Sequence, residues 1–300
     1  MMDCYLPEGR PSTTRRPADD ALAILLDAYS SGQILEGQAI SCSADHDLTV
    51  QFGNITGVIP RVETALGIEE GATKEIAILS RVGKPVCFTV IAIQEKNGML
   101  SPVFSRRAAQ RAALQHLYTL PEGAVLSATV THLEPFGAFL DVGCGVVTML
   151  GIENISISRI AHPAQRFTPG QQVYVILTGK EPSRGRVTVS HKELLGTWLE
   201  NADLFSRGMT VSGYVRGVKS YGIFVELTPN LSGLAEMQEG VLPGDRVSVF
   251  LKAILPEKRK IKLLIIDKLP PAEAVPPLRY FITEGQVSGW QYAPAVNPHP

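Results

Sequence analysis

The sequence predicts a mainly β protein of three tandem small antiparallel barrels joined by short helices. The first observation is a repeat: GAVLSATVTHLEPFGAFLDVG, which begins at Gly123, recurs in phase 85 positions later as GMTVSGYVRGVKSYGIFVELT. Each copy continues to a Gly-led strand, PGQQVYVILTG or PGDRVSVFLKA, and ends on one more alternating strand, RGRVTVSH or EKRKIKLLI. The second observation is that these alternating segments are short and are separated by Gly, Pro and Asn turns. This pattern is typical of a small antiparallel barrel.

A weaker third copy precedes these two. Residues 34–60 have the same EG opening and an alternating segment, LTVQF, followed by VGKPVCFTVIAI and NGMLSPVF in the places of the later strands. Apolar residues at helical spacing predict a helix at 19–32 and helical spacers at 105–118 and 191–205. In the C-terminal segment, RYFITEG and QVSGWQY are compatible with either a hairpin or an edge strand. We divide the chain into a disordered N-terminus (1–18), a helix plus degenerate repeat (19–102), a helical linker (103–120), repeat 2 (121–190), a second helical linker (191–205), repeat 3 (206–267) and a proline-rich extension (268–300).

The composition indicates compact folded domains, with 45% hydrophobic and 19% charged residues among 300. No apolar run approaches the ~18–20 residues of a membrane span, and the N-terminus lacks the apolar core of a signal peptide. The four cysteines have no CxxC or zinc-like spacing. We therefore expect a cytoplasmic chain with reduced thiols, no membrane partner, no metal and no cofactor. No catalytic histidine motif and no phosphate-binding glycine loop occurs, so we expect no catalytic residues and no enzymatic activity.

Charge is distributed unevenly along the chain, although the net charge is only −1. Residues 35–100 hold 5 Lys/Arg against 8 Asp/Glu, whereas residues 101–195 hold 9 against 6. Residues 196–300 hold 11 against 10. The basic excess therefore lies beyond residue 100, in the two clearer repeats.

The repeated motif places aromatic side chains on the outer face of a strand. With a period of two, the aliphatic residues of AFLDV and IFVEL share one face, which we assign to the core. The opposite face then carries Phe139 with Asp141, and Phe224 with Glu226. A bend at the preceding glycine would bring a second aromatic, Phe136 or Tyr221, to the same side. Such a pair forms a platform on which nucleic-acid bases stack. The alternative is that Phe136 and Tyr221 cap the ends of their barrels.

These residues closely resemble the S1 RNA-binding domain, a five-stranded OB-fold. The order of the repeats, the HKELLGTW linker and the RYFITEG tail together resemble short S1-type ribosomal proteins of some bacteria. The resemblance implies RNA contact through the paired aromatics and through a basic residue on the closing strand. The residues carried over are Phe136, Phe139 and Arg186 in repeat 2, and Tyr221, Phe224 and Lys260 in repeat 3. A histidine frequent in the family is replaced by Gly151 and Glu236.

Further basic residues have plausible roles in neutralising phosphate charge. For each of them, an ordinary solvated cation is the alternative. The candidates are Arg159, Arg166, Lys180 and Arg184 in repeat 2, and Arg216, Lys219, Lys252, Lys258 and Arg259 in repeat 3. The first spacer helix carries three more arginines, for which solvent exposure and contact with ribosomal RNA are the two alternatives: Arg106, Arg107 and Arg111.

Repeat 1 departs from the motif. In LTVQF we expect Leu48, Val50 and Phe52 to face inward and Thr49 and Gln51 outward, so the platform aromatics are absent. Repeat 1 is therefore expected to bind RNA poorly or not at all. The resemblance to larger S1 proteins, whose N-terminal repeats attach them to the ribosome, implies that repeat 1 instead docks on a protein partner at the small ribosomal subunit. For the whole chain we expect a monomeric, non-catalytic protein that binds single-stranded mRNA in translation. The alternatives are a ribosome-independent RNA chaperone or transcript-stability factor, and an OB-fold adaptor that binds protein and not RNA.

Overall fold

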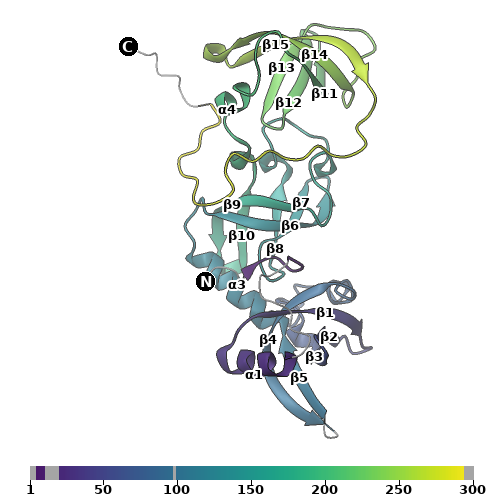
Figure 1. The fold of residues 1–300 in the computed structure, drawn as a ribbon, viewed down its shortest axis with the longest axis vertical. Coiled ribbons are helices and arrows are strands. Elements are labelled where there is room, and N and C mark those ends of the chain that lie inside the picture. The colour runs from purple at the N-terminus through teal and green to yellow at the C-terminus, as the bar shows by residue number, and fades with distance from the viewer. Residues whose placement is uncertain (1–4, 11–19, 97–98, 294–300) are drawn as a thin grey trace.

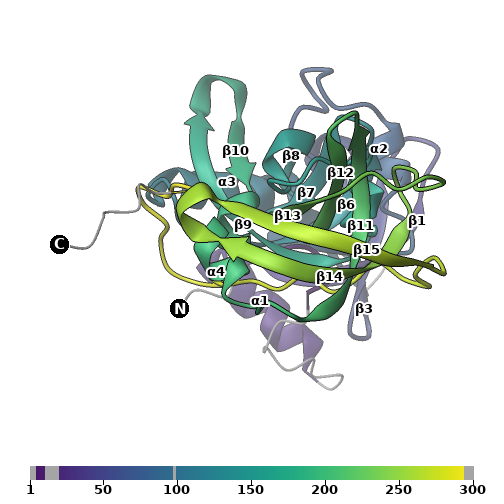
Figure 2. The same cartoon turned by 90° about the horizontal axis from the view of Figure 1, so that it is seen from above.

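The computed structural model describes residues 5–10, 20–96 and 99–293, and it confirms the mainly β architecture. Three barrel-like five-stranded sheets, which we call barrels 1, 2 and 3, follow one another along the long axis of the molecule (Figure 1). The first and third are closed, whereas the middle sheet is open between β8 and β10. Seen from above, the barrels overlie one another (Figure 2). No helix in the described part of the chain is long and apolar enough to cross a membrane.

Barrel 1 corresponds to the degenerate repeat. Its strand order is β1-β2-β3-β5-β4, and a parallel pair between Val58 and Val103 closes it. Phe88 and Phe104 stack in the core with their ring centroids 4.1 Å apart. The helix α1 (Ala21–Ser31) buries Leu25 against this core. The strands are β1 (Leu35–Cys42), β2 (Leu48–Phe52), β3 (Ile55–Ile59), β4 (Pro85–Lys96) and β5 (Met99–Ser105), with a short helix α2 (Ile76–Leu79) before β4.

Barrel 2 has the equivalent strand order, β10-β9-β6-β7-β8. Its edge strands are linked through Thr148, whose hydroxyl donates to the Val187 carbonyl at 2.6 Å. The spacer helix α3 (Arg106–Thr119) is capped by Ser105, which accepts a hydrogen bond from the Ala108 N–H, and its apolar face packs on this barrel. The strands are β6 (Val125–Glu134), β7 (Gly137–Asp141), β8 (Val147–Gly151), β9 (Gln172–Glu181) and β10 (Arg186–Ser190).

Barrel 3 is closed by a parallel pair, Leu234 with Lys262, in the order β11-β12-β13-β15-β14. The spacer before it is less helical than expected, because Gly196 adopts φ 82° and separates a 3-10 turn from the short helix α4 (Trp198–Ala202). Thr197 and Glu200 form a capping box at the start of α4. The strands are β11 (Thr210–Lys219), β12 (Gly222–Thr228), β13 (Leu231–Ala235), β14 (Arg246–Leu255) and β15 (Lys260–Leu269).

The C-terminal extension leaves barrel 3 and runs back across barrel 2 (Figure 1). It forms no hairpin within the described residues, and its edge pairing is a single antiparallel bridge between Gln286 and Ala124. Tyr280 accepts a hydrogen bond from the Tyr174 N–H at 3.4 Å, and its hydroxyl lies 3.0 Å from His191 Nε2. The extension therefore binds barrel 2, and we call residues 278–292 the C-terminal strap.

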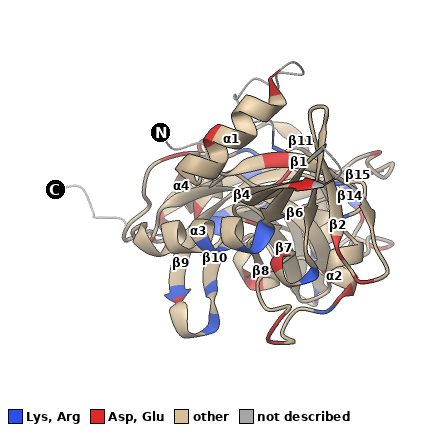
Figure 3. Ribbon diagram, turned by 90° about the horizontal axis from the view of Figure 1, so that it is seen from below, with Lys and Arg blue, Asp and Glu red and all other residues tan. Residues whose placement is uncertain are grey.

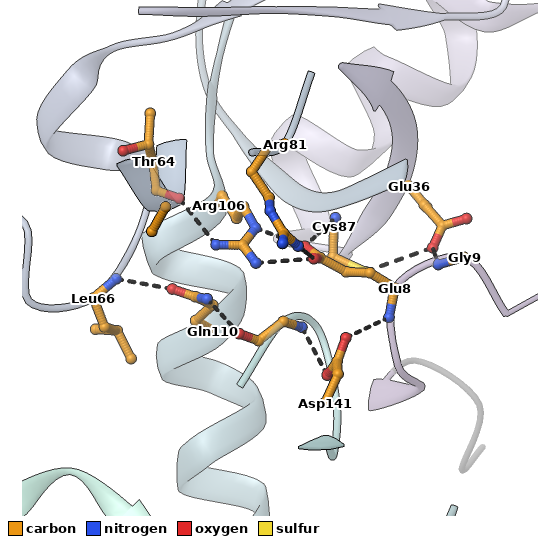
Figure 4. Close-up of polar contacts among 12 residues, drawn as sticks. Glu8, Gly9, Glu36, Thr64, Leu66, Arg81, Cys87, Arg106, Gln110 and Asp141 are labelled. Atoms are coloured by element: carbon orange, nitrogen blue, oxygen red, sulfur yellow. Dashed lines mark hydrogen bonds and ion pairs between the residues drawn. The ribbon is translucent and has the colours of Figure 1, made fainter. Parts of the chain in front are cut away.

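Residues 5–10 are placed against the protein, in contrast to the disorder expected for 1–18; the remainder of that stretch lies outside the described residues. The Glu8 carboxylate accepts two hydrogen bonds from Arg106, at 2.6 and 2.9 Å, and one from the Cys87 N–H at 3.1 Å (Figure 4). Arg81 adds an ion pair at 3.3 Å. Arg106 is consequently buried, which removes it from solvent and from any RNA. This N-terminal segment joins barrel 1, α3 and barrel 2.

Candidate nucleic-acid interface

Phe139 and Phe224 hold the same position in the sheets of barrels 2 and 3. Phe139 lies opposite Met149 on the neighbouring strand, and Phe224 lies opposite Leu234. Their strand neighbours Ala138 and Ile223 are fully buried, whereas the two phenylalanines are only partly buried. The predicted alternation of inner aliphatic and outer aromatic side chains is therefore confirmed in both barrels.

The second aromatic of each motif lies beside the first. The ring centroids of Phe136 and Phe139 are 6.2 Å apart, those of Tyr221 and Phe224 are 6.0 Å apart, and both pairs are nearly perpendicular. Phe136 is 54% exposed and Tyr221 67%, values that do not fit side chains closing the end of a barrel. Each pair thus presents ring surface to solvent. We call Phe136 with Phe139, and Tyr221 with Phe224, the aromatic platforms.

The glycine inside each motif is required by a close backbone approach. A Cβ added to Gly137 would lie 2.4 Å from the Leu150 carbonyl oxygen, and one added to Gly222 would lie 2.6 Å from that of Ala235. Any other residue would push the neighbouring strand away from the platform strand. The glycine therefore lets the chain bend while the sheet stays paired.

Side chains beyond the predicted site residues extend the platform of barrel 2. Val147 and Met149 on β8 are each about half exposed, at 49% and 48%. His132 lies opposite Phe139 on β6, with the ring centroids 6.0 Å apart. The alternation of VTMLG on β8 was the available signal, because it directs Val147 and Met149 to the outer face.

Asp141 and Glu226 lie on the outer faces of their strands, as predicted, but both are buried. Asp141 accepts hydrogen bonds from the backbone N–H groups of Glu8 at 2.8 Å, Gly143 at 2.9 Å and Gly145 at 3.1 Å. Its side chain points off the outer face of β7, as predicted, but the N-terminal segment and the following turn cover it. Burial, followed by the nearby charge of Glu8, raises the pKa of Asp141 to about 7.

Glu226 is buried by a neighbouring barrel. It accepts hydrogen bonds from Arg166 of barrel 2 at 2.5 Å and from Arg216 at 2.7 and 3.1 Å. Burial, the largest influence, lowers the pKa of Arg166. Arg166 is 4% exposed, and its guanidinium already forms an ion pair with Glu226. Arg166 and Arg216 are therefore junction residues, and we remove both from the candidate interface.

The S1 RNA binding domain family matches residues 119–192, which include all five strands of barrel 2. Barrel 2 is an S1 RNA binding domain. Barrels 1 and 3 share its strand order, which fits three S1-type repeats. Among the described residues, no group of three or more His, Cys, Asp or Glu side chains is arranged to hold a metal ion.

The chain is similar to small ribosomal subunit protein bS1 of several bacteria. That of Leuconostoc lactis is 32% identical over 185 residues, which are 58% of this chain and 40% of that protein. That of Neisseria meningitidis is 28% identical over 257 residues, which are 80% of this chain and 44% of that protein. A multidomain protein with nucleic acid binding domains from Streptococcus pneumoniae has 15% identity, covers 78% of this chain and 73% of its own, and gives a TM-score of 0.27. The chain spans less than half the length of these bS1 relatives.

The S1 repeats differ in what they place at the platform. In repeat 1, Thr49 lies opposite Val58, at the position that Phe139 and Phe224 hold in the other repeats. Counting back from this pair, His46 takes the place of Phe136, and its Nε2 lies 3.7 Å from Glu75. Leu48 and Val50 are fully buried as predicted, whereas Phe52 is only partly buried. Repeat 1 therefore has no aromatic platform.

The remaining cations of the S1 repeats are mostly exposed. The tip of the β9–β10 hairpin carries basic residues (Figure 3), among them Arg184 and Arg186, each loosely paired with Glu181. Lys180 is instead half-buried and donates to the Tyr118 carbonyl at 2.9 Å. In repeat 3, Lys252 forms an ion pair with Glu236 at 2.8 Å. The other exposed candidates are Arg159, Lys219, Lys258, Arg259 and Lys260.

The first spacer helix holds the other basic cluster. Arg107 forms ion pairs with Glu63 at 2.5 Å and with Glu69 at 2.6 Å. Arg111 is exposed. Together with the buried Arg106, this arrangement assigns two of the three arginines to contacts within the protein.

Proposed function

We propose that this chain is a non-catalytic, cytoplasmic protein that binds single-stranded mRNA through S1 repeats 2 and 3 and acts in translation on the small ribosomal subunit. The observation that carries the proposal is the aromatic platform, which recurs at one sheet position in two repeats and is replaced in the third. The match to the S1 RNA binding domain family and the similarity to bS1 proteins support it.

Stacking supplies affinity that depends little on base sequence. Every base has a π-face, and a stacked base contributes about 1–3 kcal/mol as measured by truncation of the aromatic. The nearly perpendicular rings of each platform leave ring surface free for a base. Exposed cations such as Arg186 and Lys260, which begin the closing strands of repeats 2 and 3, add phosphate contacts that weaken with salt.

Repeat 1 is proposed to contact a protein of the small subunit. It has no aromatic platform, and residues 35–100 carry a net charge of −3. The connection between β3 and β4 exposes apolar side chains to solvent, the largest fraction being 66% for Ile76. Exposed apolar patches rimmed by polar residues are typical of protein interaction sites. The other exposed apolar residues in this connection are Val62, Leu79 and Val82.

Two measurements test the proposal. The first is titration of labelled single-stranded RNA by fluorescence anisotropy, with the Phe139→Ala/Phe224→Ala double variant and Thr49→Ala as its control. We expect loss of binding in the double variant and no change in Thr49→Ala. Unchanged affinity in the double variant would rule out the stacking platforms.

The second measurement is co-sedimentation with small ribosomal subunits, using the full chain and its Ile76→Asp variant. Sedimentation that Ile76→Asp weakens, with RNA affinity unaltered, supports attachment through repeat 1. RNA binding without sedimentation would instead favour a ribosome-independent RNA chaperone. Neither activity would favour a protein adaptor.

A further inference from the structure

A buried ion pair joins repeats 2 and 3. Arg166 follows the turn Pro163–Gln165 in barrel 2, and Glu226 lies on β12 of barrel 3. Their side chains are only 4% and 5% exposed. Glu226 is also bound by Arg216 of its own barrel, so three charged side chains form one buried cluster across the junction. Separating the two barrels would break the Arg166–Glu226 contact within this cluster.

A second set of hydrogen bonds fixes the rotation between the same barrels. Asn230, which is fully buried, accepts from the Ile157 N–H at 3.0 Å and donates to the carbonyls of Lys192 and Gly196. Nearby, the Ser158 N–H donates to the Pro229 carbonyl at 3.0 Å. These bonds are directional, so they restrict orientation as well as distance.

The C-terminal strap adds a third connection. It pairs with barrel 2, where the Val287 N–H donates to the Gly123 carbonyl at 2.8 Å. Further along, the Tyr292 hydroxyl donates to the carbonyl of Asn230 at 2.6 Å. The strap thus contacts barrel 2 and the junction with barrel 3. Three separate contacts, in different directions, leave the two barrels little freedom to move relative to each other.

The junction also lies next to an aromatic platform. Glu226 is two residues from Phe224 on one strand, so both side chains leave the same face of β12. Barrels 2 and 3 follow one another along the long axis (Figure 1). A junction that fixes how these two barrels sit relative to each other therefore also fixes the separation of the two platforms.

We infer that repeats 2 and 3 form one rigid unit with two binding sites for a single RNA strand. The Arg166–Glu226 junction sets the spacing between these two sites. This inference rests on the proposed function. Once one platform holds the strand, binding to the second becomes intramolecular. The gain is greatest when the connecting RNA matches the fixed separation, and it can reach about 10²–10⁴-fold.

The test uses RNA oligonucleotides with two short base tracts joined by an abasic ribose–phosphate spacer of increasing length. Each tract is about 4 nucleotides, near the lower limit for one OB-fold. We expect affinity close to that of a single tract at short spacers, a steep rise at one spacer length, and a decline beyond it. A gradual change with no optimum would overturn the inference, because it indicates two independently moving sites.

A variant tests the role of the junction. Arg166→Gln should flatten the spacer optimum while the affinity for a single tract stays within about twofold. Arg207→Gln, which removes the same charge from an exposed position on barrel 3, should retain the optimum. Circular dichroism establishes whether Arg166→Gln remains folded; if it does not, the wild-type spacer series alone decides the question. Absence of single-tract binding in the wild type would contradict the proposed function itself, which separates the two failures.

Discussion

Asp141 and Glu226 hold equivalent positions in consecutive barrels, two residues after the platform phenylalanine, and each connects its barrel to a segment that precedes it in the chain. Asp141 accepts from the Glu8 N–H of the N-terminal segment at 2.8 Å. Glu226 accepts from Arg166 of barrel 2 at 2.5 Å. In both repeats the strand that carries the platform is thus anchored, close to its aromatic residue, to the preceding part of the protein.

Single substitutions should separate the contributions of the two platforms. We expect Phe139→Ala and Phe224→Ala each to weaken binding of single-stranded RNA by about 5- to 150-fold, the range that corresponds to loss of one stacked base. Thr49→Ala, at the equivalent position in repeat 1, should leave binding unchanged. Fluorescence anisotropy at one fixed salt concentration measures all three. An equal loss in Thr49→Ala would contradict the assignment of RNA binding to repeats 2 and 3.

Lys260 and Lys252 should differ in their effect on salt dependence. Lys260 is exposed and forms no ion pair with any described residue, whereas Lys252 is paired with Glu236. If Lys260 contacts a phosphate, Lys260→Gln should reduce the slope of log affinity against log salt by about 0.7. Lys252→Gln should reduce it less, because the charge of Lys252 is already partly neutralised. Equal slopes in Lys260→Gln and wild type would exclude this contact.

Glu8 should contribute far more to stability than an exposed acid. Glu8→Ala leaves Arg106 buried without its main partner, and we expect the free energy of unfolding to fall by about 3–5 kcal/mol. Glu69 pairs with Arg107 but is 62% exposed, so Glu69→Ala should cost less than about 1 kcal/mol. Urea unfolding of the full chain measures both. Similar losses in the two variants would show that residues 5–10 do not hold the barrels together.

Asp141 should make stability decrease as pH rises. Its pKa is raised to about 7, whereas an aspartate in an unfolded chain titrates near pH ~3.9. Between these values the folded chain retains a proton that the unfolded chain has lost. The contribution of Asp141 therefore falls by up to about 1.4 kcal/mol per pH unit from pH ~4 to ~7 and is constant above that range.

Comparison with Asp141→Asn isolates this contribution, since asparagine does not titrate and its carbonyl oxygen still accepts hydrogen bonds. The change in unfolding free energy between pH ~5 and ~8 should be more negative in the wild type than in the variant. Glu8→Gln should also weaken the dependence, because the charge of Glu8 is the second cause of the raised pKa. Identical pH profiles in wild type and Asp141→Asn would contradict the prediction.

The hydroxyl of Tyr280 should stabilise the attachment of the strap. Burial lowers the pKa of His191 to about 4, so its neutral ring accepts from Tyr280 at Nε2 while Nδ1 donates to the Ile155 carbonyl. Tyr280→Phe leaves Tyr174 N–H and His191 Nε2 without this partner, at a cost of about 1–3 kcal/mol. Tyr221→Phe, which removes a hydroxyl from an exposed side chain, serves as the control in thermal unfolding. Equal melting temperatures for the two variants would argue against a structural role for the Tyr280 hydroxyl.

The barrels and the faces of their strands were predictable because strand periodicity is a local property. The period of two correctly directed Ala138 inward and Phe139 outward. The same period also directed Asp141 outward, but strand periodicity carries no information about which other segments bury an outer face. Those segments are distant in the sequence. Glu226, for example, is buried against Arg166, which is 60 positions away. Buried and solvated arginines therefore looked alike in the sequence.

The segment at 5–10 was missed for a related reason. It is short, contains proline and glycine, and shows no periodicity, which are features shared with disordered termini. Its order depends on Arg106, which lies 98 positions beyond Glu8. Only the folded arrangement of barrel 1 and α3 brings the two together.

The C-terminal strap has a consequence for the order in which the protein is completed during its synthesis. Domains generally fold from the N-terminus as the chain emerges. Repeat 2 nevertheless obtains its contacts with Tyr280 and Val287 only after the whole of repeat 3 has been translated. In a nascent chain that ends after β15, repeat 2 would thus lack two contacts. The strand edge near Gly123 would not yet be paired, and the ring of His191 would not yet bind Tyr280.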